Sequence, residues 1–190
     1  MENFGDQGTT HLASEMPQRK KILLVDDSTF YRKAIGAILR EQGYDAYCVG
    51  DGAMALELIP ALLPDLILLD THMPGLDGYE VCLQIKSTLQ AHHIPIIFVS
   101  TSKAADDRVK AFEVGGVDYL TKPFEIEETL LRIRNQLEVQ TTRKHLNEVN
   151  SDLEQRVVKR TLQLKTVHNR LKASEERLEN ILETLQDIVW

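Results

Sequence analysis

Three carboxyl groups, a hydroxyl and an amine stand at the ends of separate short, mostly apolar runs of the sequence. They belong to Asp26, Asp27, Asp70, Ser100 and Lys122. Short apolar runs with helical patterns between them are typical of buried parallel strands. Ligands bind at the carboxyl ends of the strands in open parallel sheets, so we expect these five side chains to meet at one edge of one sheet.

The chemistry expected of this group is acceptance of a phosphoryl group by a carboxylate. Asp26 and Asp27 repel each other and the third carboxylate, and a divalent cation would relieve that repulsion. Oxygen ligands of this kind suit Mg²⁺. Asp70 precedes a loop that exposes it, and a carboxylate can attack phosphorus to form an acyl phosphate. Lys122 would neutralise the transferred phosphoryl oxygens together with the metal, and Ser100 would hydrogen-bond one of them.

Apolar runs alternate with helical patterns from residue 20 to about residue 124, which predicts one small α/β domain. The expected strands cover residues 21–25, 45–49, 66–69, 94–99 and 117–120. The expected helices cover residues 28–41, 52–62, 79–90 and 104–115, and a fifth begins near Phe124. Right-handed crossovers and the positions of the acidic ends favour a doubly wound parallel sheet in the flavodoxin-like order 2-1-3-4-5.

The composition narrows the class of protein. The chain has 190 residues, a net charge of −7 and two cysteines without metal-ligand spacing. The charge gives no global attraction to nucleic acid or to an anionic membrane, and the cysteines indicate a reducing compartment, hence a cytoplasmic protein. No apolar stretch approaches the roughly 20 residues of a membrane span. Residues 1–19 lack the apolar core of a signal peptide and are expected to form a disordered leader.

The signals change beyond Phe124. Residues 125–190 contain no proline or glycine, and apolar residues recur at spacings of three and four, which predicts one long helix. A helix of this length with one apolar stripe needs a partner, and a parallel coiled-coil homodimer is the simplest. Arg170 would pair with Glu175 of the second helix, and a four-residue insertion after Leu153 would locally unwind the coil. The expected seam contains Leu164, Leu171, Leu178, Ile181 and Leu185.

Four motifs occur in order at the ends of the expected strands. They are Asp26-Asp27-Ser28, the nine residues Asp-Thr-His-Met-Pro-Gly-Leu-Asp-Gly that begin at Asp70, Ser100, and Asp118-Tyr119-Leu-Thr-Lys122-Pro123-Phe124. On these motifs the chain resembles the receiver domain of two-component response regulators, the family of the chemotaxis response regulator. We therefore divide the chain into a leader (1–19), a receiver domain (20–136) and a coiled-coil signalling helix (137–190).

The resemblance implies roles for the residues of the acidic site. The aspartate at the position of Asp70 takes a phosphoryl group from a histidine kinase or a histidine phosphotransfer protein. The acidic pair, Asp26 and Asp27, holds Mg²⁺ as the cofactor. Asp70 and the backbone carbonyl of His72 complete the set of protein ligands that the resemblance implies.

The resemblance also implies a switch on the strands beside that site. The hydroxyl at Ser100 moves toward the phosphate, and the aromatic ring at Tyr119 then rotates inward. The peptide bond between Lys122 and Pro123 is usually cis in the family. Thr101 departs from the family pattern, which prefers Ala or Gly there, and we expect slower phosphorylation by small donors as a result.

The tail indicates what the switch would control. Residues 153–164 resemble linkers that join receivers to sensory or enzymatic modules, and residues 173–185 resemble the helix that leads into a PAS domain. We interpret the chain as a phosphoacceptor switch, not an enzyme, that passes a signal along a dimeric helix to an output module. The alternative is the receiver part of a hybrid histidine kinase or of a cyclic-dinucleotide enzyme.

Rival interpretations use the same residues. The acidic pair would merely cap the helix that follows it if no other motif were present. A histidine kinase in its own right would use His145 or His168, but neither is followed by the acid and proline of the family's histidine box. A haloacid-dehalogenase-like phosphatase would need an aspartate in place of His72. We interpret the basic run at 156–172 as a solvated helix face, because no base-reading module accompanies it.

Overall fold

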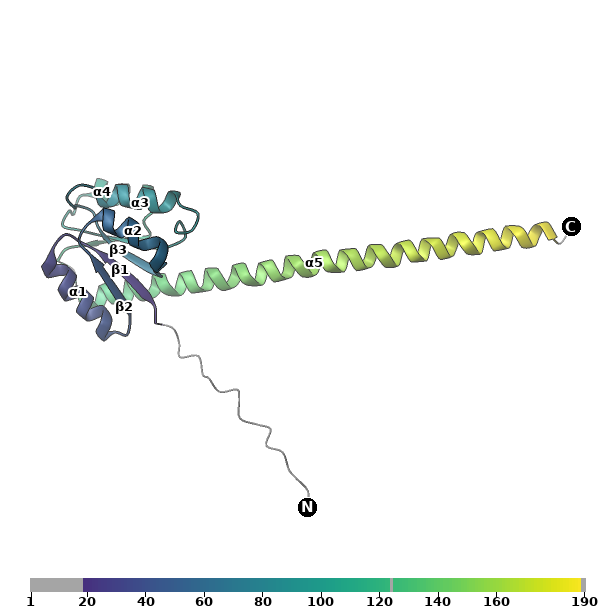
Figure 1. The fold of residues 1–190 in the computed structure, drawn as a ribbon, viewed down its shortest axis with the longest axis horizontal. Coiled ribbons are helices and arrows are strands. Elements are labelled where there is room, and N and C mark those ends of the chain that lie inside the picture. Colours follow the sequence, from purple (N-terminus) through teal and green to yellow (C-terminus); the bar gives the residue numbers. More distant parts are fainter. Residues whose placement is uncertain (1–18, 124, 189–190) are drawn as a thin grey trace, which may run out of the picture. The chain divides into compact units, whose positions relative to one another are not determined.

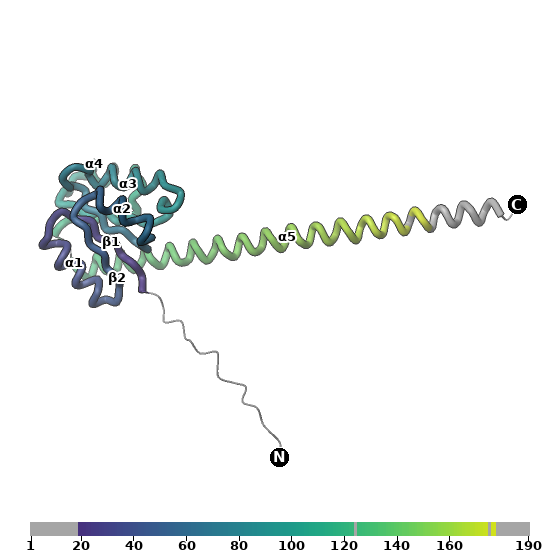
Figure 2. Tube along the Cα trace, in the orientation of Figure 1, coloured from purple at the N-terminus to yellow at the C-terminus, as the bar shows by residue number. Residues whose placement is uncertain are grey.

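A computed structural model of the chain describes residues 19–123 and 125–188 (Figure 1, Figure 2). The side chains of residue 175 and of residues 178–188 lie outside that description. The expected leader, up to residue 18, and the side chains of the seam positions Leu178, Ile181 and Leu185 therefore fall outside the described residues. The chain divides into two compact units, Met1–Glu138 and Val139–Trp190.

The first unit is built on a sheet of five parallel strands. Its strands are β1 (Lys21–Val25), β2 (Asp45–Val49), β3 (Leu66–Asp70), β4 (Ile96–Ser100) and β5 (Asp118–Thr121). Their order across the sheet is β2-β1-β3-β4-β5, which confirms the predicted doubly wound, flavodoxin-like topology. The order reverses beside β1 and β3, so the carboxyl ends of these two central neighbours lie at the point where such sheets bind ligands.

Helices cover both faces of this sheet (Figure 1). They are α1 (Thr29–Glu41), α2 (Gly52–Leu62), α3 (Gly78–Ser87), α4 (Ala105–Glu113) and the start of α5 (Ile126–Ile188). Alternate residues of a strand point to opposite faces. Accordingly Leu23 of β1 packs in a core with residues of α2, α3 and α4, whereas Leu24 packs in a second core with residues of α1 and α5. The second core is closed by Ile133 and Leu137 of α5, which are almost fully buried.

The element boundaries shift by a few residues from the predicted ones for local reasons. β4 begins at Ile96 because the Ile94 N–H donates to the Ala91 carbonyl in a turn and Pro95 has no N–H to offer a neighbouring strand. α3 ends at Ser87 because the hydroxyls of Ser87 and Thr88 donate to the Gln84 carbonyl and compete with the helical hydrogen bonds.

The second unit is the described part of α5 beyond Glu138. α5 spans 63 residues and has no glycine or proline to end it. Its apolar side chains in this unit are exposed in the single chain, as far as the structure describes them. Among the described residues, no helix is both long enough and apolar enough to cross a membrane.

Candidate functional site

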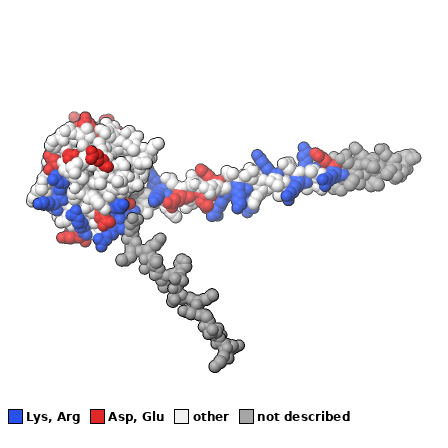
Figure 3. Space-filling model, in the orientation of Figure 1, with Lys and Arg blue, Asp and Glu red and all other residues white. Residues whose placement is uncertain are grey.

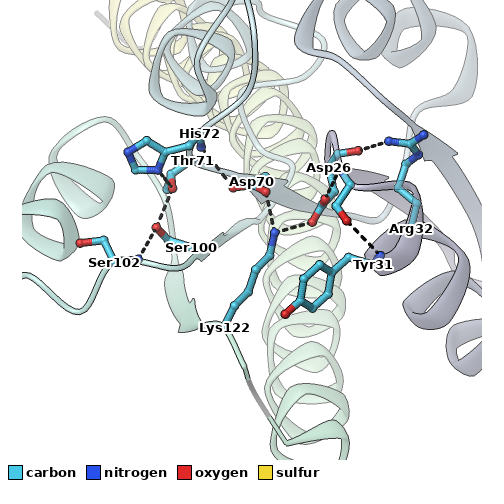
Figure 4. Close-up of polar contacts among 10 residues, drawn as sticks. Asp26, Tyr31, Arg32, Asp70, Thr71, His72, Ser100, Ser102 and Lys122 are labelled. Atoms are coloured by element: carbon cyan, nitrogen blue, oxygen red, sulfur yellow. Dashed lines mark hydrogen bonds and ion pairs between the residues drawn. The ribbon is translucent and has the colours of Figure 1, made fainter.

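The five residues singled out by the sequence lie at the carboxyl edge of the sheet, and Figure 4 shows four of them there: Asp26, Asp70, Ser100 and Lys122. Asp26 and Asp27 follow β1. Asp70 and Ser100 are the last residues of β3 and β4, one position later than the predicted strand ends, because the parallel pairing continues to that point. Lys122 follows β5 directly. Four strands thus bring together side chains that are far apart in the sequence.

Three carboxylates form a compact cluster at this edge. One oxygen from each of Asp26, Asp27 and Asp70 lies within 4.8 Å of the others. Asp26 and Asp70 are 1% and 6% exposed, whereas Asp27 is exposed, so the expectation that the loop after Asp70 exposes it was wrong. The cluster therefore has a buried side against the protein and an open side toward solvent.

Two contacts from α1 and its cap fix the position of Asp26. The Ser28 N–H donates to Asp26 Oδ1 at 2.8 Å, and Arg32 Nη1 donates to the Asp26 backbone carbonyl at 2.5 Å. The N-cap of α1 is Ser28, whose hydroxyl accepts from the Tyr31 N–H at 3.5 Å. Neither aspartate of the pair is the N-cap, which removes the interpretation of the pair as simple helix caps.

Lys122 is the cation that the described structure places inside this cluster. Its Nζ donates to Asp26 Oδ2 at 2.6 Å and to Asp70 Oδ2 at 2.5 Å, and it lies 4.6 Å from the centre of the Tyr31 ring. Burial alone would lower the pKa of the Lys122 ammonium, but the hydrogen bonds and charges of the two carboxylates outweigh it and the pKa is raised. Burial raises the pKa of Asp70, although Lys122 and the His72 N–H oppose this shift.

The charges of the cluster fit a divalent cation. One ammonium faces three carboxylates, so negative charge remains on the side where Asp27 meets solvent. Carboxylate oxygens with room for water are the donor set that Mg²⁺ prefers. The residues present here fit that ion, in agreement with the Mg²⁺ site that the resemblance implies.

The loop after β3 is shaped to hold Asp70 in place. The His72 N–H donates to Asp70 Oδ1 at 3.1 Å, and the Gly78 N–H donates to the Thr71 carbonyl at 3.1 Å. A Cβ at Gly78 would lie 2.0 Å from the Asp70 carbonyl oxygen, so only glycine allows this close return of the chain. Gly75 has a φ of +81°, which also favours glycine. His72 as a metal ligand through its carbonyl stays a prediction.

Ser100 and Tyr119, predicted as the switch residues, are both buried, on the neighbouring strands β4 and β5. The Ser100 hydroxyl accepts from the Thr71 hydroxyl at 2.7 Å and from the Ser102 N–H at 3.2 Å. Tyr119 is 6% exposed, and its hydroxyl donates to the Ser102 carbonyl at 3.0 Å. Both side chains therefore contact the same loop after β4. The peptide bond between Lys122 and Pro123 is cis.

Three residues that contact the predicted site were not singled out from the sequence. They are Tyr31, Arg32 and Thr71. Tyr31 and Arg32 reach the site because of the rotation of α1 against the sheet, and the sequence pattern does not fix that rotation to one residue. Thr71 lies next to the phosphoacceptor motif and is 1% exposed, which is unusual for a polar loop residue. Its place within the motif was the available signal.

Other residues considered from the sequence do not join this site. Thr101 is exposed, and so are His145 and His168 on α5. In the described part of α5, residues 156–172 carry basic side chains and no acidic one, and acidic side chains lie before and after this run (Figure 3). Leu164 and Leu171, two of the predicted seam residues, are 68% and 58% exposed in the single chain.

Comparisons with known proteins agree with this geometry. The profile of the response regulator receiver domain matches residues 22–134. A response regulator receiver domain from Francisella is 31% identical, with a TM-score of 0.59 over 63% of this chain and 98% of its own. The receiver domain of a signal transduction histidine kinase from Syntrophus aciditrophicus is 31% identical, with a TM-score of 0.59 over 63% of this chain and 90% of its own. The BeF3-activated N-terminal receiver domain of RstA from Klebsiella pneumoniae is 30% identical, with a TM-score of 0.58 over 62% of this chain and 98% of its own.

The matched region coincides with the sheet, its helices and the acidic site, and the profile covers more than half of the chain. The receiver fold is that of a phosphoacceptor switch in two-component signalling, not of a conventional enzyme. The chain belongs to the family of response regulator receiver domains.

Proposed function

We propose that this chain is a phosphorylation-controlled switch in which Asp70 accepts a phosphoryl group from a histidine kinase or a histidine phosphotransfer protein. The observation that carries the proposal is the position of Asp70. Its carboxylate is buried at the end of β3, bonded to Lys122 on one oxygen and within 4.8 Å of the acidic pair. A carboxylate so placed is a nucleophile with a cation ready for the charge it receives.

The proposed step exchanges one bond to phosphorus for another. A carboxylate oxygen of Asp70 attacks, the bond from phosphorus to the donor nitrogen breaks, and the donor imidazole leaves with that electron pair. Negative charge then lies on the phosphoryl oxygens, and the Lys122 ammonium would donate hydrogen bonds to them. Mg²⁺, held by the acidic pair, would supply further neutralisation of that charge. Ser100 would donate to one phosphoryl oxygen. Tyr119 would then move with the loop after β4, because its hydroxyl donates to the Ser102 carbonyl of that loop.

Acetyl phosphate with Mg²⁺ tests this proposal. The intact mass of the wild-type protein should show one added phosphoryl group, and that of Asp70→Asn should show none. Asp65→Asn is a matched control at the residue before the start of the same strand, where the carboxylate accepts from the Lys20 ammonium and the Lys21 N–H. A phosphoryl group on Asp70→Asn, or continuous release of phosphate by the wild-type protein at a phosphatase rate, would contradict the proposal.

The output route of the proposal is a parallel homodimer through α5. The support is the exposure of the seam residues Leu164 and Leu171, since a stripe of that exposure costs free energy unless it is covered. At the other end, Arg132 Nη1 bonds both oxygens of Asp118 at 2.8 and 2.9 Å and ties α5 to β5, the strand before Lys122. A change at the site would reach the helix through this strand.

Substitutions at two leucines of similar exposure distinguish a coiled coil from a helix that is simply solvated. Leu164 is on the predicted seam, and Leu162, 61% exposed, is on the opposite face of the helix. Sedimentation equilibrium should give a dimer for the wild-type chain and for Leu162→Asp, and a monomer for Leu164→Asp. A monomeric wild-type chain at tens of micromolar, or crosslinks that show antiparallel helices, would contradict the dimer.

Two further parts of the proposal concern its setting. We propose an output module after the helix, with the receiver part of a hybrid histidine kinase or of a cyclic-dinucleotide enzyme as the alternative. One similar structure, from Syntrophus aciditrophicus, is the receiver of a signal transduction histidine kinase, which keeps this alternative open. We also propose that the protein works in the cytoplasm, because both cysteines are free thiols.

A further inference from the structure

Thr71 is as buried as the residues of the core, although it is polar and lies directly after the phosphoacceptor. It is 1% exposed, and its hydroxyl donates to Ser100 Oγ at 2.7 Å. Ser100 is fully buried, and its oxygen also accepts from the Ser102 N–H at 3.2 Å. The Ser100 oxygen is thus held from two sides, by the end of β3 and by the loop after β4 (Figure 4).

His72 extends this arrangement to the surface. Its Nδ1 lies 2.7 Å from Thr71 Oγ. A hydroxyl has one hydrogen to donate, so when Thr71 donates to Ser100, the His72 Nδ1–H is the donor to Thr71. The exposed His72 ring, the Thr71 hydroxyl and the Ser100 hydroxyl then form one chain of hydrogen bonds that is independent of the bonds to Lys122.

We propose that Thr71 is a positioning residue: the hydrogen bond that it donates holds the Ser100 oxygen in its present position, which Ser100 must leave to donate its own hydrogen to a phosphoryl oxygen. Under the proposed function, on which this inference rests, Ser100 must turn its hydroxyl toward a phosphoryl oxygen on Asp70. That movement breaks the hydrogen bond that Thr71 donates to Ser100 and leaves the buried Thr71 hydroxyl without an acceptor. The lost bond opposes phosphate binding.

The consequence is a built-in bias toward the unphosphorylated arrangement. Thr71 touches neither the carboxylate oxygens of Asp70 nor Lys122 in any hydrogen bond that the described structure contains, so its effect passes through Ser100. Removing its hydroxyl while keeping its shape should therefore make the phosphorylated arrangement easier to reach. A gain in phosphate affinity on removing the hydroxyl distinguishes a residue that restrains Ser100 from one that merely supports the fold.

Binding of beryllofluoride with Mg²⁺, followed by fluorine NMR, measures this bias at equilibrium. Thr71→Val has the shape of threonine without the hydroxyl and should bind beryllofluoride about fivefold more tightly than wild type. Thr71→Ala should change affinity in the same direction, and Thr71→Ser, which keeps the hydroxyl, should bind as wild type does. Thr129→Val is a matched control, since Thr129 is 4% exposed and its hydroxyl donates to the Glu125 carbonyl outside the site. It should leave the affinity unchanged.

The same Thr71 substitution made in a Ser100→Ala protein shows whether the change in beryllofluoride affinity depends on Ser100. In Ser100→Ala protein, Thr71→Val should have no further effect on beryllofluoride affinity. Unchanged or weaker binding by Thr71→Val, or the same gain with and without Ser100, would overturn the inference while leaving the proposed function intact. A wild-type protein that binds no beryllofluoride would overturn the proposed function, and the inference with it.

Discussion

The replacement of Lys122 by methionine is the most informative test of the site's electrostatics. Lys122 places its ammonium 2.6 Å from Asp26 Oδ2 and 2.5 Å from Asp70 Oδ2, and both aspartates are buried. Methionine keeps the unbranched, flexible stem and fills a similar volume, so the packing changes little. The variant therefore removes one positive charge and leaves two buried carboxylates facing each other.

The expected loss of folding stability in Lys122→Met follows from this geometry. Removing one partner of a buried ion pair costs about 3 to 5 kcal/mol, because a buried charge is left uncompensated. The lower figure applies here, since Asp27 and the open side of the cluster admit water. A loss of about 3 kcal/mol lowers the melting temperature of a domain of this size by about 12 °C. Thermal melts in EDTA measure it.

The loss should depend on pH in a defined direction. Burial already raises the pKa of Asp70, and Lys122 lowers it, so the variant raises the pKa of Asp70 further. A carboxyl whose folded pKa lies above its unfolded value destabilises the fold above the folded pKa, and this effect fades as pH falls toward the unfolded value of about 3.9. The deficit of Lys122→Met should therefore be larger at neutral pH than at about pH 5.

Mg²⁺ should restore most of this loss, because it supplies the missing positive charge. A ligand at 100 times its dissociation constant adds about 2.7 kcal/mol of stability. The rise in melting temperature on adding Mg²⁺ should thus be larger for Lys122→Met than for wild type. Lys86→Met is the matched control: the Lys86 ammonium donates to the carbonyls of His92 and Ile94 and has no acidic partner among the described side chains. Its loss should be the same with and without Mg²⁺.

Two results would refute this reasoning. The first is a Lys122→Met protein that melts within about 2 °C of wild type in EDTA, a change too small for an uncompensated buried charge. The second is a Mg²⁺-dependent recovery of equal size in Lys86→Met. Either would mean that the two carboxylates are not charged and buried together as the geometry implies.

Four other predictions follow from the site and its surroundings. Asp27→Ala should raise the melting temperature of the Mg²⁺-free protein, because repulsion is relieved, and should diminish the Mg²⁺-induced rise. Thr101→Ala, which restores a residue that the family prefers at this position, should take phosphate from acetyl phosphate faster than wild type in an intact-mass time course, and an equal rate would argue that Thr101 does not slow phosphorylation. Gly78→Ala should lower the urea midpoint, because its Cβ would lie 2.0 Å from the Asp70 carbonyl oxygen. Iodoacetamide should label Cys48 well before Cys82, since burial raises the pKa of the Cys82 thiol to about 11; equal labelling on mass mapping would contradict the core as described.

The sheet could be predicted because each central strand is a run of apolar residues ended by a residue with a distinct chemical role. Leu66 to Leu69 illustrate this, since all four are fully buried and Asp70 follows them. Parallel strands leave little freedom in direction, so the ends of β1, β3, β4 and β5 had to meet. The chemistry of one edge followed from residue types alone.

Local competition and side-chain direction set the limit of that prediction. The early end of α3 depends on two hydroxyls, on Ser87 and Thr88, that both bond the Gln84 carbonyl. The contact between Thr71 and Ser100 depends on how the loop turns after β3, which Gly75 and Gly78 allow but do not dictate. The spacing of apolar and polar residues along the chain does not determine such a contact between two side chains.

The central claim is that Asp70 carries the phosphoryl group, and mapping the acyl phosphate tests it most directly. After acetyl phosphate and Mg²⁺, borohydride reduces an aspartyl phosphate to homoserine, which peptide mass mapping locates in the sequence. The account predicts homoserine at position 70 and at no other aspartate, including Asp26 and Asp27. Homoserine at another position, or its absence from a protein that has gained phosphate, would contradict it.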